Sequence, residues 1–189
     1  AGTAITTGDN NTFLGYRAGT AVNTAVNNVA VGTDAMLTST TGDNNIAIGR
    51  EALKRLTTSN LNIAMGSESL KETTTGTQNV AVGSNAGQFA LTADNSTFVG
   101  YQAGKGITGA KLTGNDNTAV GSSAGFLLQG AATSNTLVGK SAGQAVTTGT
   151  SNTLIGALAG DAIQAGGGNT LLGAGAGGAT TGSNNVLVG

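Results

Sequence analysis

Few residues of this 189-residue chain could carry out acid–base chemistry. Glu51 and Glu68 are the clearest pair. The chain repeats with a period of about seventeen residues, and these two glutamates stand one period apart. Paired carboxylates can serve as general acid and base. Lys54, Arg55 and Lys71 follow them closely, which favours a solvated charged surface over a catalytic dyad. The chain has no histidine and no cysteine, so histidine-based catalysis, most transition-metal sites and disulfides are excluded. We predict that the protein is not an enzyme and has no cofactor.

Oxygen ligands for a metal ion occur in three turns that contain Asp and Asn, at residues 8–11, 42–45 and 114–117. Each turn has a single carboxylate, which is few for Ca²⁺. Asp and Asn are also common in turns for conformational reasons. We therefore expect turns here, without a metal site.

The charge of the chain limits its partners. The net charge is −1 and the eight Lys and Arg residues are scattered, which argues against nucleic-acid binding. No stretch approaches the roughly 20 apolar residues that a membrane helix needs, so we expect no membrane insertion.

A ligand contact is predicted where the chain departs from its regular spacing. Residues 105–115 lie between Gly100 and Gly121, which are four residues further apart than most equivalent glycines. Loops that extend from a repeat array often carry its binding function. With Tyr101, Lys105 and Lys111 in or beside it, this loop is our candidate for contact with a glycan or a protein receptor. A tolerated insertion without function is the alternative.

One glycine recurs about every seventeen residues along the whole chain and defines a single array over residues 1–189. The glycines are Gly15, Gly32, Gly49, Gly66, Gly83, Gly100, Gly121, Gly139, Gly156, Gly173 and Gly189. Fixed periods of this kind mark solenoids, whose repeats stack to bury a common core. The last repeat ends without a polar cap, so we expect the native chain to continue or this end to dock on another subunit. We expect the array to be a fragment of a longer chain.

Each glycine is preceded by a three-residue apolar segment such as Val29-Ala30-Val31, and before that by Asn, with Ser96 as the exception. The segments predict short strands, and the Asn row predicts stacked amides that accept backbone donors at a corner. Thr- and Gly-rich turns complete each repeat. The sequence therefore predicts an all-β, parallel β-solenoid of about eleven coils. Residues 50–56 and 67–72 contain good helix formers, so we expect short helical turns in some coils.

The two faces of each strand should differ. β-branched residues dominate the first and third strand positions, which we assign to the interior. The middle position should then point outward, and its large members would form an exposed apolar row. We predict that this row is the interface of a homo-oligomer; a wide solenoid with both strand faces internal is the alternative. The predicted interface residues are Phe13, Phe98, Leu137, Leu154, Leu171 and Leu187.

Threonines in register suggest a further option. Thr118, Thr136, Thr153 and Thr170 share the first strand position, as expected of an ice-binding solenoid. Because Val29 and Ile46 hold that position in other coils, we expect these threonines inside, which disfavours ice binding.

The motif of residues 45–53, Asn-Ile-Ala-Ile-Gly-Arg-Glu-Ala-Leu, resembles repeats in the shafts of phage tail fibres that end in a self-cleaving intramolecular chaperone domain. Residues 98–104, Phe-Val-Gly-Tyr-Gln-Ala-Gly, are especially similar to them. The motif also resembles the head repeats of trimeric autotransporter adhesins, which form parallel β-rolls but are shorter. The resemblance covers nearly the whole chain.

The resemblance implies a trimeric fibre, extracellular on a virion or a bacterial surface, that spaces or presents a host-binding surface. No binding residue of either family corresponds to a position of this chain. A carbohydrate-binding or carbohydrate-active tailspike-like solenoid is the alternative function, although it would need carboxylate pairs in a groove and the sequence has few.

Overall fold

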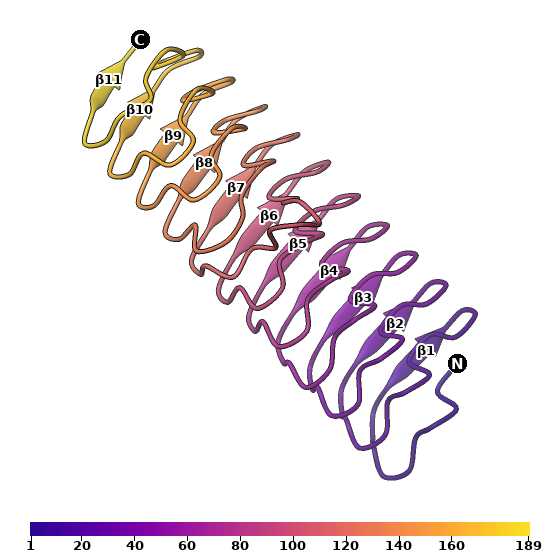
Figure 1. The fold of residues 1–189 in the computed structure, drawn as a ribbon. Helices are drawn as coiled ribbons and strands as arrows, with labels where there is room; N and C mark the ends of the chain where they lie inside the picture. The colour runs from indigo at the N-terminus through magenta and orange to yellow at the C-terminus, as the bar shows by residue number, and fades with distance from the viewer.

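The computed structural model describes all 189 residues as a rod of stacked coils, each of which contributes one three-residue strand to a single sheet (Figure 1). The strands are β1 (Thr12–Leu14), β2 (Val29–Val31), β3 (Ile46–Ile48), β4 (Ile63–Met65), β5 (Val80–Val82), β6 (Thr97–Val99), β7 (Thr118–Val120), β8 (Thr136–Val138), β9 (Thr153–Ile155), β10 (Thr170–Leu172) and β11 (Val186–Val188). They pair in chain order, and all pairs are parallel. The prediction of an all-β parallel solenoid is confirmed.

The register never slips, so each strand position forms a continuous row along the rod. Ile46 of β3, for example, pairs with Val29 on one side and Ile63 on the other. The glycine that ends each strand belongs to such a row. Gly49 has φ of 134°, and an added Cβ there would collide with the carbonyl of Gly66 in the next coil. The close stacking of these corners therefore requires glycine, which explains the period seen in the sequence.

The expected helical turns are absent. Glu51 and Leu53 have φ of 59° and 48°, and the equivalent Glu68 and Leu70 have φ of 59° and 46°. An α-helix needs consecutive residues with negative φ. The good helix formers in these two coils are thus held in tight bends, because the backbone must follow the path of the neighbouring coils, and tertiary context overrides their propensity.

The asparagine row behaves as predicted. Asn45 donates its backbone N–H and its amide Nδ2 to Oδ1 of Asn28, at 2.8 and 3.2 Å, and its Nδ2 also donates to the carbonyl of Ser59 at 2.9 Å. Its own Oδ1 accepts the backbone N–H of Asn62 at 2.9 Å. Ser96 interrupts the row with a shorter side chain whose Oγ accepts the N–H of Asn117. The amides thus satisfy buried backbone groups at one corner of each coil.

The assignment of strand faces was wrong. Phe98, Leu137, Leu154 and Leu171 are fully buried in the core, and Phe13 and Leu187 in the end coils are partly buried against it. The four fully buried residues therefore cannot form an interface between chains, and Phe13 and Leu187 pack on the core. The coil is so narrow that one residue of each strand fills its share of the interior, and the first and third residues point outward. The alternative of a wide solenoid with both strand faces internal is also wrong, because many of the first and third strand residues are exposed.

Candidate interaction surfaces

The outer face of the sheet is the most distinctive surface of the rod. It consists of two rows, which we call the first column and the third column after their strand positions. The first column is Thr12, Val29, Ile46, Ile63, Val80, Thr97, Thr118, Thr136, Thr153, Thr170 and Val186, and the third is Leu14, Val31, Ile48, Met65, Val82, Val99, Val120, Val138, Ile155, Leu172 and Val188. No charged residue interrupts either column.

The third column is aliphatic throughout and much of it is solvent-exposed. Leu14, Met65 and Leu172 expose 66, 41 and 49% of their surface. Single exposed apolar residues are common, but a continuous row of them is typical of a binding surface. Sequence reasoning missed both columns because it took β-branched character as a sign of burial, whereas a strand favours such residues on either face.

The first column changes character along the rod. Aliphatic residues occupy it from β2 to β5, and threonines occupy it from β6 to β10. The threonines are half-buried or exposed on the outer face. The expectation that they lie inside is wrong, and the reason for setting aside an ice-binding role no longer applies.

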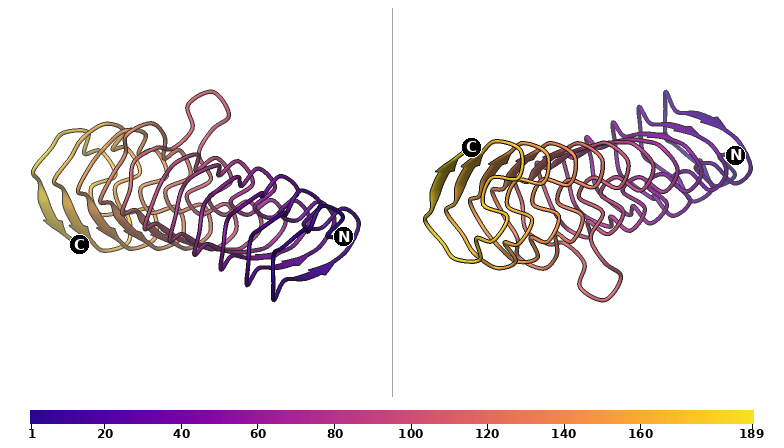
Figure 2. Two further views of the ribbon diagram at one scale, coloured as in Figure 1. Left: turned by 90° about the horizontal axis from the view of Figure 1, so that it is seen from below. Right: turned by 90° about the horizontal axis from the view of Figure 1, so that it is seen from above.

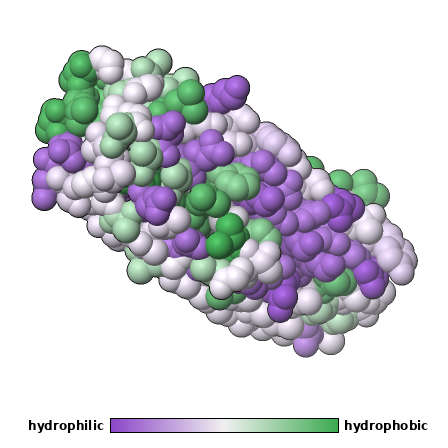
Figure 3. Space-filling view, turned by 45° about the horizontal axis from the view of Figure 1, so that its top comes forward, coloured by the Kyte–Doolittle hydropathy of each residue, from purple (hydrophilic) through white to green (hydrophobic).

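Charged residues form a second feature, concentrated in the N-terminal half of the rod, where hydrophilic side chains gather in Figure 3. Two rows of opposite charge interlock across the coils. Lys54 Nζ lies 3.8 Å from Asp34 and 3.0 Å from Glu51, and Lys71 Nζ lies 2.6 Å from Glu51 and 3.3 Å from Glu68. Glu51 and Glu68 are thus bridged by a lysine, which supports a structural role for them instead of a catalytic dyad.

The basic partners stabilise the ionised carboxylates. The hydrogen bond from Arg17 is the main reason that the pKa of Asp34 lies below its ordinary value. Lys71 lowers the pKa of Glu51 in the same way. Burial raises the pKa of Glu68, but hydrogen bonds from neighbouring basic groups outweigh this effect and the net shift is downward.

The predicted insertion projects from the rod as a hairpin, on the side away from the sheet (Figure 2). Ile107 and Ala110 pair across its tip, and Leu112 rejoins the coil stack. Lys111 Nζ lies 2.7 Å from Glu72 Oε2, two coils away. Lys105 lies over the ring of Phe126 at 5.4 Å. Both lysines are therefore engaged within the chain.

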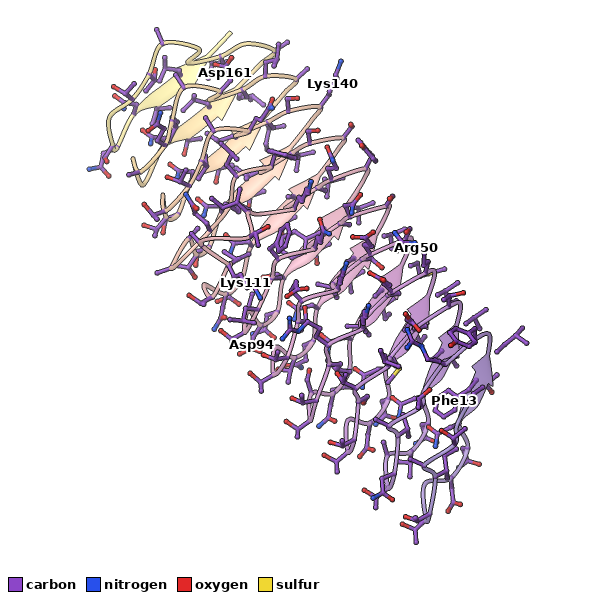
Figure 4. All side chains as sticks on the ribbon, turned by 45° about the vertical axis from the view of Figure 1, so that its right-hand side comes forward. Phe13, Arg50, Asp94, Lys111, Lys140 and Asp161 are labelled. Atoms are coloured by element: carbon purple, nitrogen blue, oxygen red, sulfur yellow. The ribbon has the colours of Figure 1, made fainter.

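The structure does not gather the three predicted ligand residues into one site. Tyr101 is 55% exposed and directly follows the glycine that ends β6, the same coil position as Arg50 and Lys140. Arg50 and Lys140 lie along one edge of the rod, and Lys111 lies along the other (Figure 4). Tyr101 and Lys111 therefore belong to different sides.

Apart from these surfaces, the rod has one hollow. The hollow, of about 330 Å³, is lined by Ala162, Gln164, Ala165, Gly166 and Thr181, none of which is titratable. The acidic residues do not form a cluster suited to a metal ion. The chain has no helix able to cross a membrane.

The fold and surfaces define the chain as a parallel β-solenoid repeat protein. No family model, curated protein or solved structure matches it.

Proposed function

We propose that the chain is a structural segment of an oligomeric, extracellular fibre, on a phage tail or a bacterial surface, that spaces or presents a host-binding surface. The observation that supports this proposal best is the uncharged, largely aliphatic outer face that runs the length of the rod. An isolated rod would leave this face in water, whereas an oligomer would bury it.

The internal construction suits a mechanical role. Eleven strands at about 4.8 Å spacing give a rod about 50 Å long. Every coil is bonded to the next by backbone hydrogen bonds at several corners, and the amide row adds further bonds. Because each coil is held by both neighbours, bending the rod would strain many bonds at once, and the segment should be stiff.

The hairpin provides a surface for contact with a host. It points away from the sheet, so an assembly joined through the sheet would leave its tip in solvent. A glycan array read with the native chain and with residues 107–110 replaced by Gly-Gly tests this part of the proposal. Binding that survives the replacement would place the contact elsewhere.

Sedimentation of the native protein tests the oligomer directly. We expect a multiple of the 18.1 kDa chain mass. In the double variant Met65→Lys, Ile155→Lys, two charges are added to the third column at residues that a monomer leaves 41 and 37% exposed. The variant should fold but sediment as a monomer. The matched control Thr75→Lys, Thr148→Lys places the same charges on exposed turns and should keep the native mass. A native monomer would contradict the proposal.

Ice binding is a second candidate function, favoured by one observation, the outward-facing threonines of β6 to β10. Their hydroxyl and methyl groups repeat about every 4.8 Å along the rod, with the third column about 6.6 Å further along each strand. Such a regular, uncharged array can order a layer of water. Both candidate functions need the same face, so they exclude each other in one assembly. Thermal hysteresis from a monomeric protein, lost in Thr136→Lys, would favour ice binding over the fibre.

A further inference from the structure

We infer that the partner of the sheet face is a second copy of this chain, lying parallel and in register, so that each strand faces the same strand of its neighbour. The inference rests on the proposed oligomer and specifies its geometry. It excludes the antiparallel arrangement, in which β1 of one copy would lie beside β11 of the other.

The first column distinguishes the two arrangements. In a parallel assembly, Ile46 and Ile63 meet their own counterparts, and Thr136 and Thr153 meet theirs. Aliphatic groups then cover aliphatic groups, and threonine hydroxyls can bond to threonine hydroxyls. An antiparallel assembly places the threonines of β7 to β10 against the aliphatic residues of β2 to β5. The hydroxyls would be dehydrated there without partners, which is unfavourable.

The size of the face is compatible with a specific contact between copies. Eleven strands at about 4.8 Å spacing, each about 10 Å long, give a footprint of about 500 Å² on one copy. Two copies bury about 1,000 Å², which is close to the lower bound for specific interfaces. The margin is small, so the full length of the face must be used. Only a parallel in-register or a fully overlapping antiparallel arrangement achieves this, and a staggered one does not.

A parallel assembly also has a consequence for the hairpins. Because every copy has its hairpin in the same coil, the tips of all copies lie at one level of the fibre and point away from its axis. The assembly therefore presents identical contacts at a single height. An antiparallel pair would present them at opposite sides of its centre instead.

Spin labelling can test the arrangement cleanly, because the chain contains no cysteine. Single cysteines are introduced as Thr33→Cys near the start of the rod and Ala157→Cys near its end, both exposed and directly after the glycine that ends a strand. Thr108→Cys at the hairpin tip is the control, since it faces away from the sheet. Native mass of each labelled protein is confirmed by sedimentation before pulsed electron paramagnetic resonance is measured.

A parallel assembly predicts strong coupling between labels in the Thr33→Cys protein and, separately, in the Ala157→Cys protein. A mixture of the two should show only weak coupling between unlike sites, and Thr108→Cys should show a longer distance than either. Strong coupling only in the mixture would establish the antiparallel arrangement and overturn the inference, while the oligomer itself would stand. Weak coupling in every oligomeric sample would show that the sheet face is not the contact. A monomeric native protein would instead remove the proposed function on which the inference rests.

Discussion

Gly104 lies against the ring of Phe98, and an added Cβ at this glycine would overlap the ring. The same relation holds between Gly160 and Leu154, with a Leu154 methyl carbon 2.7 Å from the position of the added Cβ. In coil three the sizes are reversed, because Ala47 is the middle strand residue and Leu53 stands where the glycine would be. In these coils the two positions thus share one interior volume. Where both are small, as for Ala81 and Gly87, side chains of the neighbouring coils such as Phe98 and Leu70 fill the space.

Replacing the Phe98 and Gly104 pair by the Ala and Leu pair of coil three should show this shared volume directly. Phe98→Ala removes a fully buried ring and should lower the free energy of unfolding by about 3–5 kcal/mol. Gly104→Leu should cost about 1–3 kcal/mol because it overpacks the core. Their combination copies the pair found in coil three and should be more stable than the sum of the two losses by about 1–3 kcal/mol. Urea unfolding of the four proteins measures the coupling.

The backbone at residue 104 allows this test. Gly104 has φ of 56°, close to the 48° at which Leu53 is accommodated, so leucine meets no new kind of strain there. Phe98→Ala combined with Gly87→Leu serves as a comparison, because Gly87 also touches the Phe98 ring but belongs to the neighbouring coil. Losses that simply add in both double variants would mean that the sites do not share their space.

The relation between the sizes of these two core residues was not recognised in the sequence, whereas other features of the fold were predicted. The repeat, the strands and the amide row could be predicted because each depends on one residue type at a fixed spacing. Which strand face is internal could not be read from the strand residues alone, since alanine and leucine both occur at the middle position. The signal lay in a pair of positions six residues apart, where Phe98 accompanies Gly104 and Ala47 accompanies Leu53. Two coils depart from it, with Ala and Gly together at these positions. The outer columns follow once that pairing is recognised.

The amide row should contribute strongly to stability. Asn62 is fully buried, donates to Asn45 Oδ1 at 3.2 Å and to the carbonyl of Gly76 at 3.0 Å, and accepts the backbone N–H of Asn79 at 3.0 Å. Asn62→Ala leaves these buried groups without partners and should cost about 2–4 kcal/mol. Thr75→Ala, on an exposed turn, should change the unfolding free energy by less than about 0.5 kcal/mol. Similar losses in both variants would contradict the importance of the row.

The break in the amide row offers a stabilising substitution. Ser96 stands where other coils have Asn, and Asn79 Oδ1 already accepts its backbone N–H at 2.9 Å. Ser96→Asn should restore the continuous chain of amides and raise the unfolding free energy by about 0.5–1.5 kcal/mol, the net value of a hydrogen bond. Chemical denaturation measures the change. A lower stability would mean that this corner leaves no room for the longer side chain.

Adjacent residues on opposite strand faces should respond very differently to the same charge. Leu154 is fully buried and Ile155 is 37% exposed. Leu154→Asp buries an unpaired carboxylate and should prevent folding, with loss of the native circular dichroism spectrum. Ile155→Asp should retain the spectrum, since the carboxylate remains in contact with solvent, but should lower the sedimenting mass. An unfolded Ile155→Asp protein, or a folded Leu154→Asp protein, would reverse the assignment of the two faces.

The charged rows should make stability depend on pH in the acid range. Arg17 and Lys71 lower the pKa values of Asp34 and Glu51 in the folded chain. As the pH falls, the unfolded chain therefore takes up protons first, which favours unfolding. The stability that these carboxylates contribute is fully present above their unfolded pKa values, near 4, and is lost as the pH falls through the lower folded values. The side chains of Lys71 and Glu51 are 24 and 15% accessible, so solvent screens their pair, which should contribute only about 0.5–1 kcal/mol. The unfolding free energy of Glu51→Gln should therefore depend less steeply on pH, between about 5 and 2, than that of the native protein. High salt should reduce the difference between the two proteins.

Asp161→Asn, whose carboxylate lies in the C-terminal half away from these rows, is the matched control and should follow the native curve. Identical pH profiles for Glu51→Gln and the native protein would show that the interlocked charges are energetically neutral.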